Sequence, residues 1–169
     1  TRNHKTSKMK ENERQFADIV KQHKSSIYSV CYMFAKDADE ADDLFQEVLI
    51  NLWKGMDSFR HESKINTWIW RVSFNTCISA DRKKKRKKEV RLSMDVNRFE
   101  SPDEDSRQIR MLHERIHRLQ PFDRAIVMLW LEGISYEEIG AIVGISVKNV
   151  SVRLVRIKEM LKQMNSHDE

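Results

Sequence analysis

The sequence predicts an all-α protein in which two small helical domains are joined by a flexible linker. Glycine and proline, the residues that interrupt helices most often, are scarce, at 4 and 2 of 169 residues. Apolar residues recur at intervals of three and four over most of the chain, and no run of Val, Ile and Thr alternates with polar residues as in a strand. These observations leave helices as the elements from which the fold is built.

The first domain is expected over residues 11–88, after a polar tail at residues 1–10 that we expect to be disordered. Within it, an apolar pattern over about residues 11–35 predicts one helix or two. The polar stretch 89–107 has no helical periodicity, and a structureless stretch of that length is unusual inside one compact domain, so it predicts a linker. The second domain is then expected over residues 108–165.

Charge and cysteine content narrow the class of protein. The net charge of +5 and the pI of about 9.2 are compatible with a nucleic-acid partner. Cys31 and Cys77 lie far apart within apolar helical patterns, which is typical of buried thiols in a reducing compartment rather than of a disulfide framework. No apolar run approaches the length of a membrane span and no signal peptide is recognisable, so we expect a cytoplasmic protein without membrane insertion.

The second helix of the first domain is predicted from about Ala41 to Gly55, and its surface is sharply divided. One side is apolar; the other carries the acidic and polar residues Asp42, Asp43, Gln46, Glu47 and Asn51, with Ile50 and Trp53 in or beside them. Apolar anchors supply binding energy and charges supply selectivity, so this side favours a protein-docking surface. The alternative is a solvated amphipathic helix whose Trp53 packs back on the core.

A long helix is predicted after a loop over residues 56–65, with Asn66 or Thr67 as its cap. The helix is apolar nearly all round, except for one stripe at intervals of three and four: Trp68, Arg71, Asn75, Ser79 and Arg82. Aromatic, guanidinium, amide and hydroxyl groups in one line suit unstacked bases and phosphates. The basic run 82–88, which includes Lys83, extends the stripe and is expected to contact duplex phosphates. The alternative is a Trp68 packed in the core and an Arg71 paired with an acid.

The C-terminal domain, whose first two helices are separated by Pro121, ends in a pattern typical of a helix-turn-helix. Ser135 and Glu138 form the pattern of a capping box, and Gly144 is expected to end this short helix in the left-handed conformation. Ser146 is expected to cap a second helix with an apolar face of Val147, Val150, Leu154 and Ile157. Two short helices around a glycine turn suit a DNA major groove.

The outward side of that second helix is expected to read DNA. It starts at Ser146, and on a helical wheel the residues opposite the apolar face are Lys148, Asn149, Val152, Arg153 and Arg156. An amide suits adenine, guanidinium groups suit guanine or phosphate, and a methyl-bearing side chain suits thymine. The alternative is an ordinary basic, solvated helix face.

A zinc protease motif, H-E-x-x-H, is formally present at residues 113–117. The apolar register Ile109, Leu112, Ile116 and Leu119 leaves both histidines on the flank of the helix, and no third ligand follows. We interpret them as surface histidines and expect no metal site. The sequence also lacks a glycine-rich phosphate loop and a nucleophile elbow, so we expect no catalytic residues and no cofactor, and the protein is not expected to be an enzyme.

Three of these segments together resemble a known family. Asp39-Glu-Ala-Asp-Asp-Leu-Phe-Gln-Glu-Val48 resembles the core-polymerase-binding segment of bacterial sigma factors, and Trp68-Ile-Trp-Arg-Val-Ser-Phe-Asn75 resembles their promoter-melting helix. Leu119-Gln-Pro121 with the helix-turn-helix is similar to their second DNA-binding domain. The order and spacing are similar to those of group IV, or extracytoplasmic-function (ECF), sigma factors of the sigma-70 family. One departure is Gly140, which stands where alanine is common.

The resemblance implies a transcription initiation factor with two promoter-reading surfaces. The β′ clamp helices of core RNA polymerase would bind Asp42, Asp43, Gln46, Glu47, Ile50 and Trp53. The −10 element would meet Trp68, Arg71, Asn75, Ser79, Arg82 and Lys83, with the loop from Phe59 to Asn66 helping to hold a flipped base. The −35 element would be read by Ser146, Lys148, Asn149, Val152, Arg153 and Arg156. Further implied partners are the polymerase β flap and an anti-sigma factor. The alternative is a free-standing helix-turn-helix regulator, which would leave the acidic helix and the Trp68–Arg82 stripe without a role.

Overall fold

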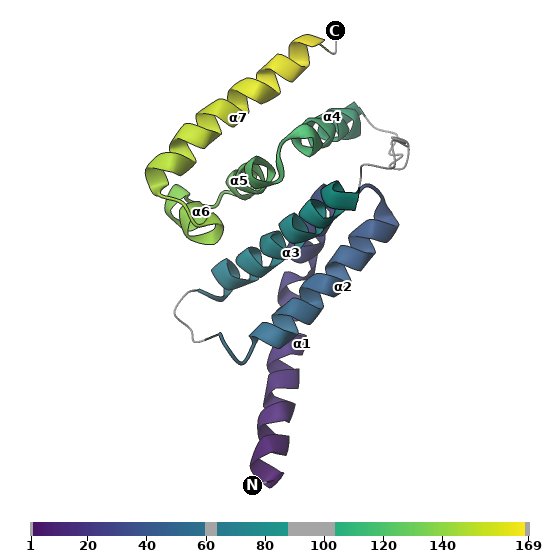
Figure 1. Ribbon diagram of the computed structural model, residues 1–169, viewed down its shortest axis with the longest axis vertical. Helices are drawn as coiled ribbons and strands as arrows, with labels where there is room; N and C mark the ends of the chain where they lie inside the picture. The colour runs from purple at the N-terminus through teal and green to yellow at the C-terminus, as the bar shows by residue number, and fades with distance from the viewer. Residues whose placement is uncertain (1, 60–63, 88–103, 168–169) are drawn as a thin grey trace. The chain divides into compact units, whose positions relative to one another are not determined.

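The computed structural model describes residues 2–59, 64–87 and 104–167, and these residues form helices and no strand. The elements are α1 (Arg2–Phe34), α2 (Ala38–Gly55), α3 (Ile65–Lys87), α4 (Glu104–Arg118), α5 (Pro121–Leu131), α6 (Tyr136–Val143) and α7 (Val147–His167) (Figure 1). The prediction of an all-α fold is confirmed. None of these helices is long and apolar enough to cross a membrane.

The chain divides into two compact units, residues 1–77 and 78–169, so the division falls within α3. The domain limits expected from the sequence, 11–88 and 108–165, therefore remain predictions. Most of the predicted linker lies outside the described residues, but its last four positions, 104–107, belong to α4.

The core of the first unit is formed by α1, α2 and the N-terminal part of α3. Helices α1 and α2 pack side by side, and the edge of Phe34 on α1 meets the ring of Phe74 on α3 with centroids 6.2 Å apart. A polar link joins α2 to α3, because the amide of Asn51 donates to the Thr76 hydroxyl at 2.9 Å. The buried apolar side chains include Ile27, Val30 and Cys31 from α1, Leu44, Val48 and Leu52 from α2, and Ile69 and Cys77 from α3. Both cysteines are buried thiols, as the sequence predicted.

Three helix boundaries in this unit differ from the prediction. Helix α1 extends back to Arg2, so the disordered tail expected at residues 1–10 is wrong for the positions that the structure describes. Helix α2 begins at Ala38 instead of about Ala41, with Asp37 as its N-cap, since the Asp37 carboxylate accepts from the Glu40 N–H at 2.9 Å. Helix α3 begins at Ile65, and Thr67 is a buried first-turn residue rather than a cap.

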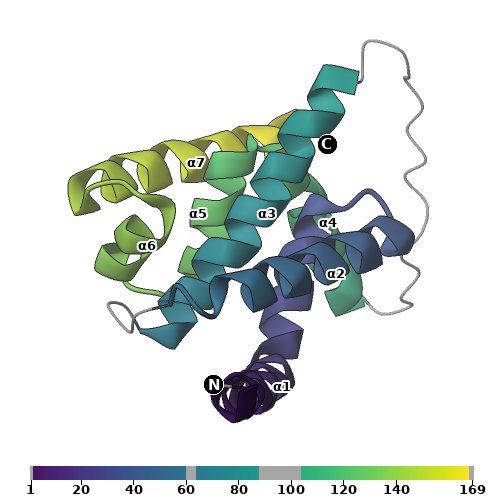
Figure 2. The same cartoon turned by 60° about the horizontal axis from the view of Figure 1, so that its bottom comes forward.

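The second unit contains the predicted helix-turn-helix. The Ser135 hydroxyl accepts from the Glu138 N–H, Gly144 ends α6 at φ 80° and ψ 36°, and the Ser146 hydroxyl accepts from the Asn149 N–H. Each of these boundaries was predicted and is confirmed. Helices α5, α6 and α7 pack on one another, as Figure 2 shows, and Val150, Leu154 and Ile157 form the buried face of α7. Val147, predicted for the same face, is instead 46% exposed.

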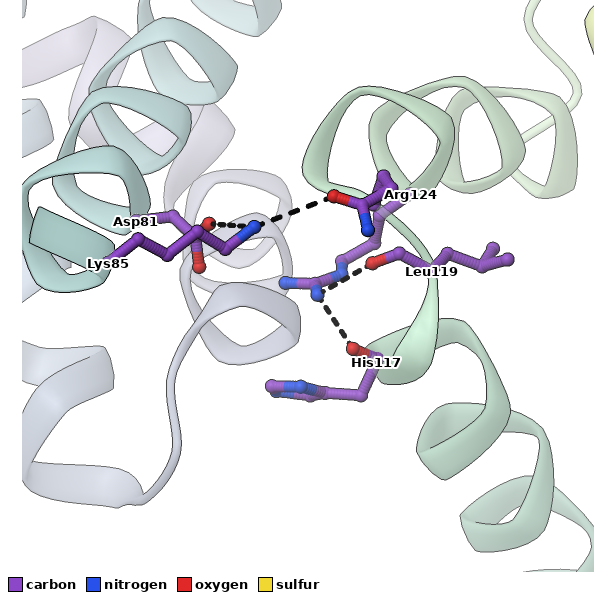
Figure 3. Close-up of polar contacts among 6 residues, drawn as sticks. Asp81, Lys85, His117, Leu119 and Arg124 are labelled. Carbon is purple, nitrogen blue, oxygen red and sulfur yellow. Dashed lines mark hydrogen bonds and ion pairs between the residues drawn. The ribbon is translucent and has the colours of Figure 1, made fainter. Parts of the chain in front are cut away.

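A buried arginine that the sequence did not single out closes the corner between α4 and α5. Arg124 is 5% exposed, and its guanidinium donates to the carbonyls of His117 at 2.7 Å and Leu119 at 3.0 Å (Figure 3). These carbonyls lie at the C-terminal end of α4, where the backbone has lost its helical partners. Ile116 on α4 and Leu119 just after it are buried, whereas Ile109 and Leu112, predicted for the same core register, are 56% and 37% exposed.

The turn of the helix-turn-helix leaves no room for a side chain at Gly140. A Cβ atom at this position would lie 2.6 Å from the backbone oxygen of Ile145, and the Gly140 carbonyl accepts from the N–H groups of Gly144 and Ile145. We expect Gly140→Ala to lower the free energy of unfolding of this unit by about 1–3 kcal/mol, as overpacking does elsewhere.

Urea or thermal unfolding followed by circular dichroism measures this effect. The control is Gly133→Ala: Gly133 has φ 75°, but a Cβ atom at this position would have no neighbouring atom within 4 Å. The control therefore loses free energy of unfolding only because alanine is strained in the left-handed conformation, which costs about 1 kcal/mol. An unfolding free energy for Gly140→Ala at or above that of the control would contradict the prediction.

Candidate protein and nucleic-acid interfaces

The acidic side of α2 is exposed along its length. We call it the docking face, and it consists of Asp42, Asp43, Gln46, Glu47, Ile50 and Trp53. Ile50 is 51% and Trp53 39% exposed, although both are large apolar side chains. On the opposite side of the helix, Ala41, Leu44, Val48 and Leu52 are at most 4% exposed. The helix therefore separates a core face from a face with charges and two apolar anchors.

Helix α1 contacts two side chains of the docking face, and no sequence pattern indicated these contacts. The Tyr28 hydroxyl donates to the carboxylate of Asp42 at 3.3 Å, and the ring of Phe16 contacts Trp53 edge to face at 5.3 Å. Burial, the charge of Asp42 and this hydrogen bond raise the pKa of Tyr28 above its usual range. Trp53 thus packs against Phe16 and is still 39% exposed, and its docking role stays a prediction.

The stripe predicted on α3 is only partly an open surface. We call it the strand face: Trp68, Arg71, Asn75, Ser79, Arg82 and Lys83. Asn75, Ser79, Arg82 and Lys83 are exposed, and Arg71 is half-buried. Lys85, further along the basic run, is exposed and pairs with Asp81 one turn back at 3.5 Å.

Trp68 differs from the other members of the strand face because its ring is held by neighbours. The indole stacks on Phe59, with centroids 4.8 Å apart and planes inclined by 27°. Its edge also lies over Gly55, where a Cβ atom would be 3.2 Å from the ring. One face of the indole is therefore occupied, as the packed alternative for Trp68 predicted. Phe59 was expected only as part of a loop, and its stacking partner could not be inferred from spacing.

Four of the predicted residues, Lys148, Asn149, Val152 and Arg156, are exposed on the outward side of α7, and we call these four the recognition face. Ser146 is exposed but acts as the helix cap. The prediction that Arg153 lies opposite the apolar face is wrong. Its position, three residues after the buried Val150 and four before the buried Ile157, turns it toward α5.

Arg153 is held there by two contacts with α5. Its guanidinium pairs with the Asp123 carboxylate at 2.8 Å and lies over the ring of Phe122, 4.7 Å from the centroid. One helical turn and a half further on, Lys158 lies over the ring of Trp130 at 4.3 Å. Two cation–π contacts and an ion pair thus clamp α7 on α5 and fix the direction of the recognition face.

The histidine motif of α4 lies on a partly buried flank. Burial lowers the pKa of His113, and the neighbouring charge of His117 lowers it further. Within the described ranges, no group of three or more His, Cys, Asp or Glu side chains is placed to hold a metal ion.

Comparison with known proteins gives consistent matches for both units. Residues 19–87 match the family Sigma-70 region 2, and residues 109–161 match the family Sigma-70, region 4. The ECF RNA polymerase sigma factor SigW of Bacillus subtilis is 30% identical over 165 residues, which are 88% of this chain and 87% of SigW. The ECF RNA polymerase sigma-E factor of Escherichia coli is 26% identical over 168 residues, covering 90% of this chain and 87% of that protein.

Two solved structures have the same fold at 21% sequence identity. The sigma factor RpoE in complex with the anti-sigma factor NepR, from Bartonella quintana, has a TM-score of 0.76 and covers 92% of this chain and 99% of that one. CnrH in complex with the cytosolic domain of CnrY has a TM-score of 0.69 and covers 93% of this chain and 91% of that one.

Proposed function

The chain belongs to the ECF sigma factors of the sigma-70 family and acts as an alternative sigma factor in transcription initiation, and on this premise we propose which surface performs each step. The docking face of α2 binds the clamp helices of the polymerase β′ subunit. The strand face of α3 captures the melted −10 element, and the recognition face of α7 reads the −35 element as duplex. The polymerase supplies the chemistry, so this chain needs no catalytic group of its own.

The observation that carries the proposal is the exposure of Ile50 and Trp53 among the carboxylates of α2. A helix that served only the fold would gain free energy by burying these side chains or replacing them with polar ones. Their exposure on the same side of α2 as Asp43 and Glu47 gives a partner two apolar anchors next to acidic groups, as in an interface hot spot with polar surroundings. A free-standing regulator of duplex DNA has no use for such a surface.

The second unit supports duplex reading by its geometry. The caps of α6 and α7 and the clamp of Arg153 and Lys158 on α5 fix α7, so that its outward residues form a rigid set. An amide, two cationic groups and a methyl-bearing side chain are the groups that distinguish base pairs in the major groove. The β flap of the polymerase is the further partner that we propose for this unit.

We also propose that an anti-sigma factor regulates the protein. Two solved structures of the same fold support this: one holds the sigma factor RpoE in complex with the anti-sigma factor NepR, and the other holds CnrH in complex with the cytosolic domain of CnrY. Because a sigma factor acts together with RNA polymerase, we place the protein in the cytoplasm. Buried thiols such as Cys31 stay reduced in that compartment.

Run-off transcription tests the proposed function. The template is the DNA upstream of the protein's own gene, and the reaction contains bacterial core polymerase with or without the purified chain. A protein-dependent transcript with a defined start is expected. If the chain alone binds that duplex but no transcript forms, the free-standing regulator is correct instead.

Asn75 provides a sharper test of the strand face. Its side chain is exposed in the middle of the face, so Asn75→Ala removes an amide without opening the core. We expect a loss of preference at one position of the −10 element, worth about 1–3 kcal/mol, with core-polymerase binding unchanged. Transcription from a set of −10 single-base variants measures it, and an unchanged preference profile would show that Asn75 is not a reader.

A further inference from the structure

The N-terminal half of α1 extends beyond the core of the first unit. The first buried residue of the helix is Ile19, and the described side chains of residues 3–11 are all exposed. Figures 1 and 2 show these turns running past the ends of α2 and α3. Burial therefore does not explain why this segment is helical or what its side chains contact.

The residues of this extension are basic. Between residues 2 and 10 there are four basic residues and no acidic one, and the segment lies before the part of the chain that matches Sigma-70 region 2. One helical stripe runs through Lys5, Lys8, Asn12, Phe16 and Ile19, at intervals of three and four. The side of α1 that is apolar over the core thus becomes polar and then basic where it leaves the core.

The extension is tied to the corner where the strand face begins. The Asn12 amide donates to the Asp57 carboxylate at 3.1 Å, and the Lys8 ammonium lies 3.9 Å from the same oxygen. Asp57 belongs to the turn after α2 in which the N–H groups of Ser58 and Phe59 donate to the Gly55 carbonyl. Phe59 then stacks on Trp68, the first residue of the strand face.

We propose that this basic arm, residues 2–12, binds the phosphate backbone of promoter DNA beside the melted −10 element. This proposal rests on the proposed function, because that function places promoter DNA on the strand face, beside the turn that contains Asp57 and Phe59. Lys5 and Lys10 have no acidic partner among the residues that the structure describes, and the pair of Lys8 with Asp57 is long and solvent-exposed on both sides. Such a pair contributes little to stability, so Lys8 can exchange Asp57 for a phosphate.

Other partners fit the arm less well. A membrane-binding helix needs a broad apolar face, whereas Met9 is the one large apolar side chain between residues 2 and 10. A protein-docking surface needs apolar or aromatic anchors like those of the docking face, and the arm has none besides Met9. Phosphate binding requires only positive charge at regular spacing, which the arm provides.

The test compares two variants of the full chain in holoenzyme with core polymerase. Lys5→Gln with Lys8→Gln removes the charge of the arm and keeps Asn12, which anchors it. The matched control is Lys21→Gln with Lys24→Gln, because these lysines are also exposed, have the same spacing and lie on the same helix beyond the arm. The measurement is the Kd for promoter DNA as a function of salt, with probes taken from the start site mapped by transcription.

We expect the arm variant to bind several-fold more weakly at low salt, with the slope of log K against log salt reduced in magnitude by about 1.4–1.8, for two lost phosphate contacts. The control is expected to match the wild type. Two probes show which part of the DNA the arm contacts. Weaker binding to a single-stranded −10 oligonucleotide assigns the contact to the melted strand. Weaker binding only to a forked probe assigns it to the adjoining duplex.

Two results would overturn the proposal. If the arm variant binds both probes with wild-type affinity and slope, the arm does not contact DNA. If it loses affinity for core polymerase in the absence of DNA, the arm is a polymerase contact instead. In both cases the wild-type holoenzyme still binds promoter DNA, whereas a failure of the wild type itself would reject the proposed function together with this inference.

Discussion

Replacing Asp43 and Glu47 together with alanine is expected to weaken the binding of this sigma factor to core polymerase by about 2–4 kcal/mol, roughly 30- to 1,000-fold. Both carboxylates are exposed on the docking face, one helical turn apart, and they precede the apolar anchors Ile50 and Trp53 along α2. Their loss removes charge complementarity and leaves the basic groups of the partner unpaired in the interface. The fold should be preserved, because neither side chain contributes to the core.

A binding titration of fluorescently labelled chain with core polymerase measures this loss at two salt concentrations. The matched control is Glu13→Ala with Asp18→Ala, which removes the same charge from exposed positions on α1. The helix-turn-helix should still bind −35 duplex in the docking variant as in the wild type. Equal core affinity for the two double variants would show that the acidic side of α2 is only a solvated face, the alternative that the sequence left open.

The second prediction with a large effect is that Arg153 and Arg156 of α7 have different roles in binding the −35 element. Arg156→Ala is expected to cost about 1–3 kcal/mol at one position of the −35 element and to relax base preference there, because this side chain is exposed on the recognition face. Arg153→Ala is expected to weaken binding to all −35 sequences alike and to lower the stability of the unit. The reason is that Arg153 pairs with Asp123 and covers Phe122 instead of facing outward.

Binding to a library of −35 variants, combined with urea unfolding, separates the two roles. A double-mutant cycle with Asp123→Asn should give a coupling energy of about 1 kcal/mol or less for the pair, since part of the arginine is solvent-exposed. Arg153→Lys should recover part of the stability. If Arg153→Ala instead changes the preference at a single base pair and leaves stability unaffected, then Arg153 leaves Asp123 on binding and reads DNA.

The helix-turn-helix could be predicted from the sequence because each of its boundaries depends on the chemistry of one residue. Ser135 and Ser146 offer a hydroxyl to an N–H three residues on, and Gly144 adopts a conformation that other residues avoid. These are local interactions, which do not require knowledge of the rest of the fold. The exposed side of α2 was predictable for a similar reason, since a regular helix fixes which residues share a side.

The errors concern side chains whose direction depends on partners far away in the sequence. The pattern of α7 predicted Arg153 on the side opposite the apolar face, but Asp123, thirty residues earlier, pairs with it and draws it toward α5. The stack of Phe59 on Trp68 depends on the path of a turn, and the burial of Arg124 depends on two carbonyls at the end of another helix. The start of α1 was missed because polar residues without a cap or a periodic apolar pattern give no signal for a helix.

The way α7 is held has a consequence for reprogramming this protein. The direction of the helix is set by contacts on its inner side and flank, through Val150, Arg153, Leu154, Ile157 and Lys158. Lys148, Asn149, Val152 and Arg156 take no part in that support and are exposed. These four positions can therefore be randomised together at little cost to stability, as is usual for surface substitutions. Helices α5, α6 and α7 can thus serve as a constant scaffold. Variants at the four exposed positions can be selected for −35 sequences that the host's own promoters do not use.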